Sequence, residues 1–247
     1  IFMSVCVCKT CGFHNINLPL TRYPIRYKQM TEIVKTADGS HTIYVPEIDE
    51  HYHSIHGAIS ESEHIFIKNG LNHSNADPVR IFEVGFGTGL NALLTCIHAS
   101  AEKKKVCYTS IEKYPLSENI VRSLNYPGLT GSAGRQWFEQ IHSCKWNNPS
   151  EINEYFILHK IHGDITSEMM EGLYDIIYFD AFGPLKQPEM WAPDIFSKIS
   201  GITVSGGILV TYSVKGDVKR ALRSNGFIVS LIPGPRGKRH ILRAVKI

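Results

Sequence analysis

Three alternating glycines follow an acidic residue at the end of an apolar run, in the stretch Glu83-Val84-Gly85-Phe86-Gly87-Thr88-Gly89. Glycine lets the backbone turn sharply and approach a ligand closely, and the loop after a strand of an open α/β sheet is where such ligands bind. An ordinary tight turn would explain one or two glycines, but not three behind a glutamate. The dinucleotide fingerprint would also need a glycine at position 90, where the chain has leucine. This spacing disfavours a nicotinamide-dependent dehydrogenase.

Two further acids follow the next apolar runs. Glu112 ends the run at residues 106–112, and a carboxylate in that position can accept both ribose hydroxyls of a bound nucleoside. Taken alone, it would be interpreted as a solvated charge at a strand end, but its spacing from the glycine loop favours a ligand. Asp164 follows Gly163 after the run that ends at residue 162, where contact with an adenine amino group is expected. A turn-forming Gly-Asp pair is the alternative for Asp164.

Asp180 is the candidate for acid–base chemistry. It ends a fourth apolar run, within Tyr178-Phe179-Asp180-Ala181-Phe182-Gly183-Pro184. At the carboxyl edge of a sheet its carboxylate would face the reactive end of a bound cofactor, where it can orient an amine and take its proton. A helix-capping aspartate is the alternative. The aromatic residues and prolines around Asp180 indicate a shaped pocket rather than a plain cap.

These residues need a sheet that brings the ends of several strands together. Strands are predicted at residues 79–84, 106–112, 155–162, 174–180, 207–213, 227–231 and 241–245, and helices at 89–101, 116–124, 166–171, 188–199 and 217–224. This alternation predicts an α/β domain over residues 79–247, with a doubly wound, mostly parallel, seven-stranded sheet covered on both faces. No helix separates the last two strands, so we expect them to pair antiparallel. Residues 126–153 interrupt the pattern and are predicted to be an insertion, helical around 135–142.

The segment before this domain, residues 29–78, is predicted to be a small N-terminal extension. A β-hairpin around Asp38-Gly39 and a helix over residues 57–70 are expected there. Residues 1–28 are expected to be a poorly ordered leader. Three cysteines within the leader, Cys6, Cys8 and Cys11, stand at a spacing that zinc could use. Because one cluster on a loose terminus is a poor site, we predict no metal.

Composition narrows the class of protein further. The 247 residues are 43% hydrophobic and 20% charged, which is a globular rather than a disordered balance. The formal net charge of +3 is compatible with a polyanionic partner. No apolar run reaches the ~18 residues that a membrane span needs, and the N-terminus does not have the pattern of a signal peptide. We therefore expect a soluble cytoplasmic protein with no membrane partner.

Three motifs resemble the methyltransferase domain of the MnmC family and its stand-alone relatives, called MnmD. They are EVGFGTGLN at residues 83–91, IEKYP at 111–115 and FDAFGPLKQPEMW at 179–191. The segment YHSIHG at 52–57 and the tail at 206–237 are similar to the family as well, so the resemblance covers nearly everything from about residue 29 onward. It implies a class I S-adenosylmethionine-dependent fold. It also implies methylation of 5-aminomethyl-(2-thio)uridine at the tRNA wobble position.

The resemblance assigns roles to individual residues. Asp180 is implied to be the catalytic acid–base residue, and Glu112 the ligand of the cofactor ribose. The expected S-adenosylmethionine contacts are Glu83, Gly85, Gly87, Gly89, Asn91, Glu112, Lys113, Asp164 and Asp180. The expected substrate and tRNA contacts are Tyr52, Phe182, Pro184, Trp191, Lys215, Arg236, Lys238 and Arg239. The basic members of this set would neutralise phosphates, although a solvated charged face is the usual alternative.

Bifunctional members of the family carry a C-terminal flavin oxidoreductase domain. This chain has no second glycine fingerprint before Ile247, so neither flavin nor the oxidative step is expected. Two alternatives from other classes stay open. A polyamine aminopropyltransferase would share the fold and an amine acceptor, but would need an acidic pocket for a polycation. A non-catalytic RNA-binding relative would need neither the intact glycine loop nor Asp180.

Overall fold

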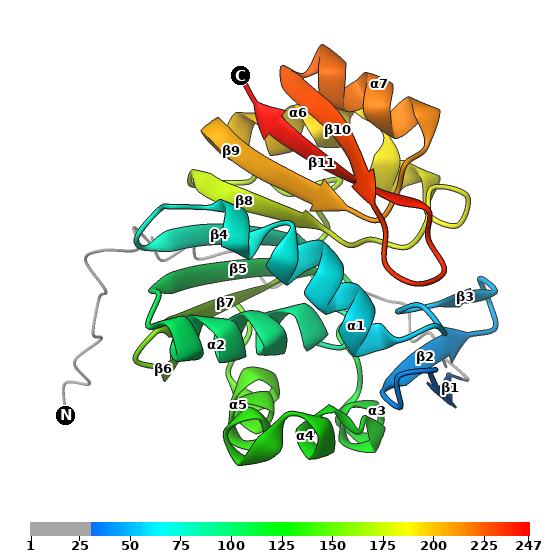
Figure 1. Cartoon of the computed structure of the whole chain (residues 1–247), viewed down its shortest axis with the longest axis vertical. Coiled ribbons are helices and arrows are strands. Elements are labelled where there is room, and N and C mark those ends of the chain that lie inside the picture. The colour runs from blue at the N-terminus through cyan, green and yellow to red at the C-terminus, as the bar shows by residue number, and fades with distance from the viewer. Residues whose placement is uncertain (1–30) are drawn as a thin grey trace.

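The computed structural model of the chain describes residues 31–247 as a central sheet between helices, with a small second sheet at one end (Figure 1). The predicted leader at residues 1–28, with Cys6, Cys8 and Cys11, lies outside the described residues. Within residues 31–247, no helix is long and apolar enough to cross a membrane.

Eight strands form the central sheet, in the order β10-β11-β9-β8-β4-β5-β7-β6. They are β4 (Val79–Val84), β5 (Val106–Glu112), β6 (Pro149–Asn153), β7 (Phe156–His162), β8 (Tyr174–Phe179), β9 (Thr203–Thr211), β10 (Phe227–Pro233) and β11 (His240–Lys246). The five inner strands from β7 to β9 run parallel, and β6, β11 and β10 pair antiparallel toward the two edges. The predicted doubly wound fold and antiparallel last pair are therefore confirmed. Because β5 and β8 flank β4, the loop after β4 lies where strand order reverses, which is the usual ligand position in such sheets.

The prediction of seven strands was wrong by one, because β6 lies in the segment interpreted as an insertion. Its sequence, Pro-Ser-Glu-Ile-Asn, lacks an apolar alternation, and only Ile152 is buried. An edge strand pairs on one side through its backbone, so it forms without the hydrophobic pattern that identifies an inner strand. The rest of this segment is largely helical, as α4 (Tyr126–Leu129) and α5 (Gly131–Ser143).

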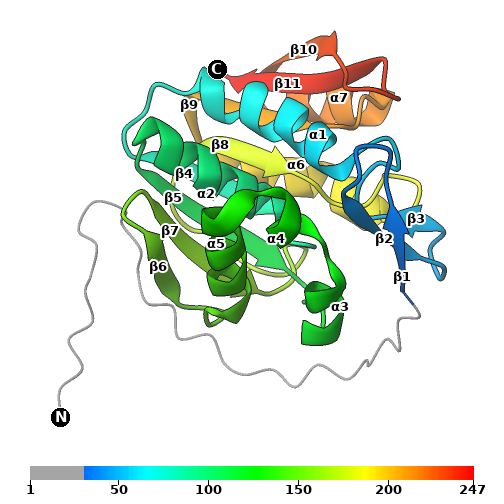
Figure 2. The ribbon, with the colours of Figure 1, turned by 60° about the horizontal axis from the view of Figure 1, so that its bottom comes forward.

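Helices cover both faces of the central sheet (Figure 2). A buried apolar cluster lies between each face and its helices. The remaining helices are α1 (Ala58–Ser62), the π-helix η1 (Glu63–Lys68), the 3-10 helix η2 (Leu71–His73), α2 (Leu90–Glu102), α3 (Glu118–Ser123), the 3-10 helix η3 (Pro188–Trp191), α6 (Pro193–Ile202) and α7 (Gly216–Ser224). On one face, Leu93 of α2 and Phe138 of α5 belong to one buried cluster with Tyr108 of β5. On the other face, Phe196 of α6 and Leu222 of α7 share a second cluster with β8.

Two helix predictions differ from the structure. Residues 166–171 are not helical, because a turn at 165–167 is followed by irregular chain. Lys198 Nζ donates hydrogen bonds to three carbonyls there, those of Ile165, Thr166 and Glu168. A distant lysine thus satisfies carbonyl groups that a helix would pair internally. The helix predicted at 188–199 is divided into η3 and α6, because Pro193 begins a new helix at its first position.

The N-terminal strands form a separate antiparallel sheet, β1 (Glu32–Lys35), β2 (His41–Val45) and β3 (Glu50–His51). The expected hairpin is present, with Gly39 at a φ of 85° in its turn. Ile43 and Val45 of β2 are buried in the same apolar cluster as α2. The small sheet is thereby fixed against the main sheet, and the segment that follows β2 is held near the carboxyl ends of the parallel strands.

Candidate active site

A cavity of about 540 Å³ opens at the carboxyl ends of β4, β5, β7 and β8. Its floor is formed by the loops that follow these strands. Its opposite side is formed by residues 45–55 and Glu61 from the N-terminal region, with Lys238 from the loop between β10 and β11. The cavity therefore brings together three parts of the chain that are far apart in sequence.

The glycine loop forms one wall of this cavity, through Gly85 and Gly87. Both have positive φ values, 90° and 49°, which glycine adopts without strain. A Cβ on Gly85 would lie 2.8 Å from the backbone oxygen of Asp180, so a side chain there would push the two strand ends apart. Gly89 does not line the cavity. It directly precedes α2 with a φ of 70°, and a Cβ there would meet His142 Nε2 at 2.8 Å.

Glu112 lies in the cavity wall beside the glycine loop. Its Oε2 accepts a hydrogen bond from the Gly87 backbone N–H at 3.0 Å, and its Oε1 accepts one from the Tyr114 N–H at 2.8 Å. These two bonds fix the carboxylate at the end of β5 and leave further lone pairs for a ligand. The sequence prediction that Glu112 and the glycine loop belong to one site is consistent with this geometry.

Asp164 and Lys113 form an ion pair in the same cavity, with Lys113 Nζ 2.6 Å from Asp164 Oδ2. The other oxygen of Asp164 accepts hydrogen bonds from the N–H and the hydroxyl of Thr166. Burial raises the pKa of Asp164, but the bonds from Lys113 and Thr166 outweigh it and hold the pKa below its usual value. Asp164 is therefore a charged carboxylate. It also stabilises the turn that follows Gly163, which was the alternative role considered for it.

Asp180 is linked to Glu83 through a single amide. The side chain of Asn91 donates one hydrogen bond to Asp180 Oδ2 at 2.8 Å and another to Glu83 Oε1 at 3.0 Å. Burial raises the pKa of Asp180 to about 7, against the lowering effect of the Asn91 bond. A carboxylate with such a pKa can gain or lose a proton near neutral pH.

Glu83 lies beneath the cavity and does not line it. Its side chain is 1% exposed, and its Oε2 accepts a hydrogen bond from Ser110 Oγ at 2.6 Å. Burial raises the pKa of Glu83 to about 8, although the bonds from Ser110 and Asn91 act in the opposite direction. Glu83 was predicted to contact the cofactor, but in the structure it contacts Asn91, which does line the cavity.

Aromatic side chains form the part of the cavity next to Asp180. Tyr52 and Phe182 meet edge to face, with ring centroids 4.9 Å apart, and both line the cavity. Trp191 lies below them. It is 6% exposed, and its indole N–H donates to the Phe182 carbonyl at 2.7 Å. Trp191 and Pro184 are not among the lining residues, so Trp191 supports the aromatic wall rather than forming part of it.

Two lining residues, Glu61 and Tyr212, are absent from the site predicted by sequence analysis. Tyr212 donates its hydroxyl to the carbonyl of Ala181 at 2.8 Å. Glu61 forms an ion pair with Lys238, with 2.8 Å between Oε1 and Nζ. Glu61 follows no strand, and Tyr212 directly follows β9 but is not an acid, so the pattern of an acid after an apolar run identified neither. The sequence signal near these two residues was the similarity of residues 52–57 and of the tail at 206–237 to a known family.

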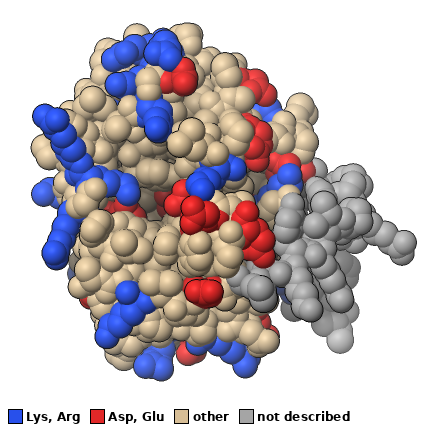
Figure 3. Space-filling view, turned by 90° about the vertical axis from the view of Figure 1, so that its right-hand side faces the viewer, with Lys and Arg blue, Asp and Glu red and all other residues tan. Residues whose placement is uncertain are grey.

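The lining of the cavity is acidic, while Lys and Arg side chains lie at the margins of the same face. The lining contains seven carboxylates, Glu47, Glu50, Glu61, Glu112, Asp164, Asp180 and Glu189, against three lysines, Lys113, Lys186 and Lys238. Figure 3 shows acidic side chains gathered near the middle of this face and Lys and Arg along its top and left margins. Three predicted RNA contacts, Lys215, Arg236 and Arg239, are exposed. Within residues 31–247, no group of His, Cys, Asp and Glu could hold a metal ion.

Comparisons of this chain with protein families and with known proteins agree with one another. Residues 130–247 match a family described as S-adenosyl-L-methionine-dependent methyltransferase. The protein named tRNA 5-methylaminomethyl-2-thiouridine biosynthesis bifunctional protein MnmC from Pseudoalteromonas atlantica is 30% identical to this chain, and the match covers 86% of this chain and 34% of that protein. The protein of the same name from Chromohalobacter salexigens is 32% identical, over 83% of this chain and 31% of that protein. The chain thus spans about a third of the length of these relatives.

A solved structure is also similar. The crystal structure of MnmC2 from Aquifex aeolicus matches with a TM-score of 0.75 and 29% sequence identity, and the match covers 89% of this chain and 71% of that chain. The similarity therefore extends over the N-terminal region as well as the central sheet.

Proposed function

Because the chain belongs to the family of MnmC-like S-adenosyl-L-methionine-dependent methyltransferases, we propose that it methylates the aminomethyl nitrogen of 5-aminomethyl-(2-thio)uridine at the tRNA wobble position. One observation carries this proposal. Asp180, a carboxylate whose pKa is raised to about 7 by burial, lines the same cavity as the glycine loop and the aromatic pair Tyr52 and Phe182. A tRNA substrate would also place the activity in the cytoplasm.

The residues of the cavity fit S-adenosyl-L-methionine, which supplies an electrophilic methyl group on a sulfonium centre when bound. Gly85 and Gly87 present backbone without side chains, and Glu112 and Asp164, which line the same cavity, would accept hydrogen bonds from ribose hydroxyls and an adenine amino group. Asn91 is 3% exposed, and its Oδ1 is a buried acceptor with no partner among the described residues. A buried acceptor without a partner is costly, so a ligand N–H donor would stabilise the site. The acidic lining suits a cationic ligand.

Asp180 would act on the substrate amine. A primary alkylamine is protonated at neutral pH and has no free lone pair until the proton leaves. Asp180 can first hold the ammonium group and then accept its proton, which leaves the nitrogen lone pair available for transfer. Tyr52 and Phe182 offer ring faces to an unstacked base, and a nucleotide in a loop is the kind of RNA substrate that reaches such a pocket.

The test is mass spectrometry of nucleosides from tRNA that carries 5-aminomethyluridine, after incubation with the protein and S-adenosyl-L-methionine. We expect a gain of one methyl group on the aminomethyl nitrogen. The acidic cavity would also suit a polyamine, so a parallel reaction contains decarboxylated S-adenosylmethionine and putrescine. Aminopropyl transfer without methylation of tRNA would replace the proposal by a polyamine aminopropyltransferase.

Glu112→Ala is expected to weaken S-adenosyl-L-methionine binding by about 1–3 kcal/mol, because ribose hydroxyls lose a charged acceptor and the Gly87 N–H loses its partner. Calorimetric titration with the cofactor measures the change. Glu118→Ala is the matched control, since Glu118 is exposed on α3 and paired with Arg122. Equal affinities for wild type and Glu112→Ala would remove Glu112 from the cofactor site.

Arg236→Ala and Arg239→Ala are each expected to reduce the salt dependence of tRNA binding. Each lost phosphate contact lowers the slope of log affinity against log salt concentration by about 1. Fluorescence titrations with tRNA between low and physiological salt give this slope. Lys105→Ala is the control, because Lys105 precedes β5 at the opposite end of the strands. Slopes that stay equal to the wild-type value would exclude this loop from the RNA interface.

A further inference from the structure

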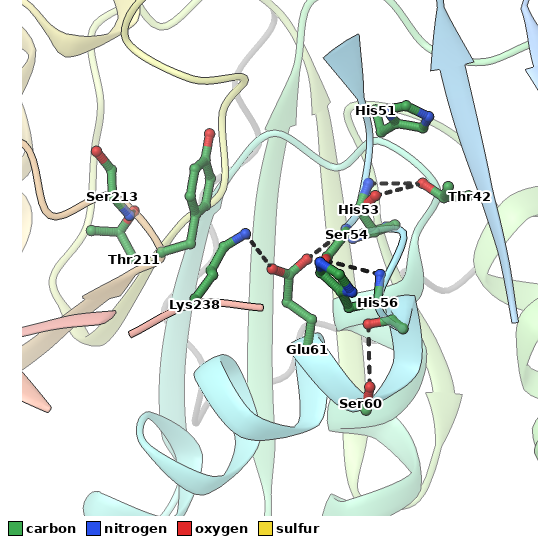
Figure 4. Close-up of polar contacts among 12 residues, drawn as sticks. Thr42, His51, His53, Ser54, His56, Ser60, Glu61, Thr211, Ser213 and Lys238 are labelled. Carbon is green, nitrogen blue, oxygen red and sulfur yellow. Dashed lines mark hydrogen bonds and ion pairs between the residues drawn. The ribbon is translucent and has the colours of Figure 1, made fainter. Parts of the chain in front are cut away.

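The ammonium group of Lys238 lies inside the candidate active site. Lys238 comes from the connection between β10 and β11, and its Nζ is 2.8 Å from Glu61 Oε1 and 5.3 Å from the centroid of the Tyr212 ring. Figure 4 shows Lys238 pointing toward Glu61 of α1, with a dashed line between the two side chains. A carboxylate and an aromatic face around one ammonium group form a recognition site for an organic cation.

The two partners of this ammonium group are fixed independently of it. Glu61 is 8% exposed, and its Oε2 accepts the Ser54 backbone N–H at 2.8 Å. The Tyr212 ring is held by its hydroxyl bond to the Ala181 carbonyl and by an edge contact with Trp191. Lys238 itself has a side chain that is 29% exposed and has a flexible four-carbon stem. The two partners are therefore held in place by contacts that do not involve Lys238, while Lys238 is more exposed than Glu61 and reaches them on a longer side chain.

The cation site adjoins the reacting groups. Glu61, Tyr212, Lys238 and Asp180 all line the same cavity, and the charges of Glu61 and Lys238 both act on Asp180. Tyr212 bonds to the backbone of the residue that directly follows Asp180. A small cation held between Glu61 and the Tyr212 ring is thus next to the carboxylate that would accept its proton.

We propose that Glu61 and the Tyr212 ring bind the ammonium group of the substrate before methylation, and that Lys238 occupies this site until the substrate enters. The inference rests on the proposed function, because it takes 5-aminomethyluridine as the substrate. The chemical match is close, since both the lysine side chain and the aminomethyl group end in a primary ammonium on a methylene carbon. The substrate must displace Lys238, which therefore lowers the affinity for every amine that uses the site.

The simpler reading of the same contacts is a structural link that ties the loop between β10 and β11 to α1. The two readings differ in what happens when the lysine charge is removed. A structural link predicts that loss of Lys238 loosens the site and leaves amine binding equal or weaker. If Lys238 instead occupies the substrate site, its loss is predicted to make amine binding tighter.

The first experiment measures binding of the nucleoside 5-aminomethyluridine to the protein loaded with S-adenosyl-L-homocysteine, by calorimetry. The nucleoside has no phosphate, so the RNA-binding surface does not contribute. Glu61→Gln is expected to weaken its binding at least about 10-fold, because a charge-assisted hydrogen bond is lost. Glu63→Gln, on the neighbouring helix turn and paired with His98, is the matched control and should match wild type. Uridine, which lacks the amine, should bind all three proteins equally.

The second experiment uses Lys238→Met, which keeps an unbranched side chain of similar length without the charge. We expect 5-aminomethyluridine to bind several-fold more tightly to this variant than to wild type, and uridine to bind equally. Lys68→Met, which removes an exposed lysine charge in the last turn of η1, should leave nucleoside binding unchanged. Equal or weaker binding of the amine by Lys238→Met would overturn the inference even if Glu61→Gln fails to fold. Absence of tRNA methylation by wild type would instead overturn the proposed function, which is measured separately.

Discussion

Asp180→Asn is expected to lower the rate of methylation by about 10²–10⁴-fold, the usual contribution of a positioned general base, while S-adenosyl-L-methionine binds with nearly unchanged affinity. Asparagine keeps the shape of the side chain and an oxygen that can accept from Asn91, whose amide now bonds Asp180 at 2.8 Å. It lacks the charge that holds an ammonium group and the basicity that removes its proton. Single-turnover methylation of tRNA carrying 5-aminomethyluridine measures the effect.

The difference in methylation rate between wild type and Asp180→Asn should depend on pH. Burial raises the pKa of Asp180 to about 7, and a general base must be deprotonated, so the wild-type rate should rise with pH and level off above about 7. The variant has no such group, and its rate should continue to rise toward higher pH because more substrate amine is already neutral. The difference between the two proteins should therefore shrink as pH increases.

Asp194→Asn is the matched control, since Asp194 is an exposed acid in the first turn of α6. It should follow the wild-type rate at every pH. A near-normal rate for Asp180→Asn at neutral pH would show that Asp180 is a helix cap or a binding residue. The proton acceptor would then have to be another carboxylate of the cavity.

Local sequence signals predicted the strand-end part of the site. Glu112, Asp164 and Asp180 each follow an apolar run, and parallel strands bring such ends to one edge of a sheet. The glycine loop was predicted for the same reason, because its backbone conformation depends on residues next to one another in the chain. In the structure Asp164, Asp180, Glu112 and two of the three glycines line one cavity.

The other half of the site depends on contacts that no local pattern encodes. Glu61 and Lys238 lie 177 positions apart in the chain, and they meet at 2.8 Å only because α1 and the loop after β10 lie over the same sheet edge. Likewise, no local pattern in the sequence predicts that Trp191 is buried beneath Phe182 rather than exposed to a substrate. The edge strand β6 was missed because its pairing uses backbone groups, which every sequence supplies.

Glu83 was predicted to contact the cofactor, whereas in the structure its carboxyl group contacts Asn91 and Ser110. Its carboxyl group is buried beneath Asn91 and bonded to Ser110, and burial raises its pKa to about 8. At neutral pH Glu83 is therefore mostly protonated, so that Asn91 lies between a neutral carboxyl group and the charged or reacting Asp180. Two buried carboxylates bridged by one amide would repel each other if both were ionised.

This protonation predicts a large and unusual pH dependence of stability. The unfolded chain releases the proton of Glu83 near pH 4.5, whereas the folded protein holds it up to about pH 8. Between these values the folded state binds more protons, so the free energy of unfolding falls as pH rises, by up to about 1.4 kcal/mol per pH unit from this group. Glu83→Gln resembles the protonated acid in shape, can accept the hydrogen bond from Asn91, and does not titrate.

We therefore expect the stability of Glu83→Gln relative to wild type to increase by on the order of 2 kcal/mol between pH 6 and pH 8. Urea unfolding of both proteins at the two pH values gives the double difference, in which contributions from other groups, such as the buried His53 and His142, cancel. Glu139→Gln, on an exposed position of α5, should show no such change. If the difference between wild type and Glu83→Gln is the same at both pH values, Glu83 is already ionised in the folded protein. In that case Asn91 bridges two negative charges. The charge on Glu83 would then make it harder for Asp180 to lose a proton. Asp180 would therefore be a stronger base than its own burial implies.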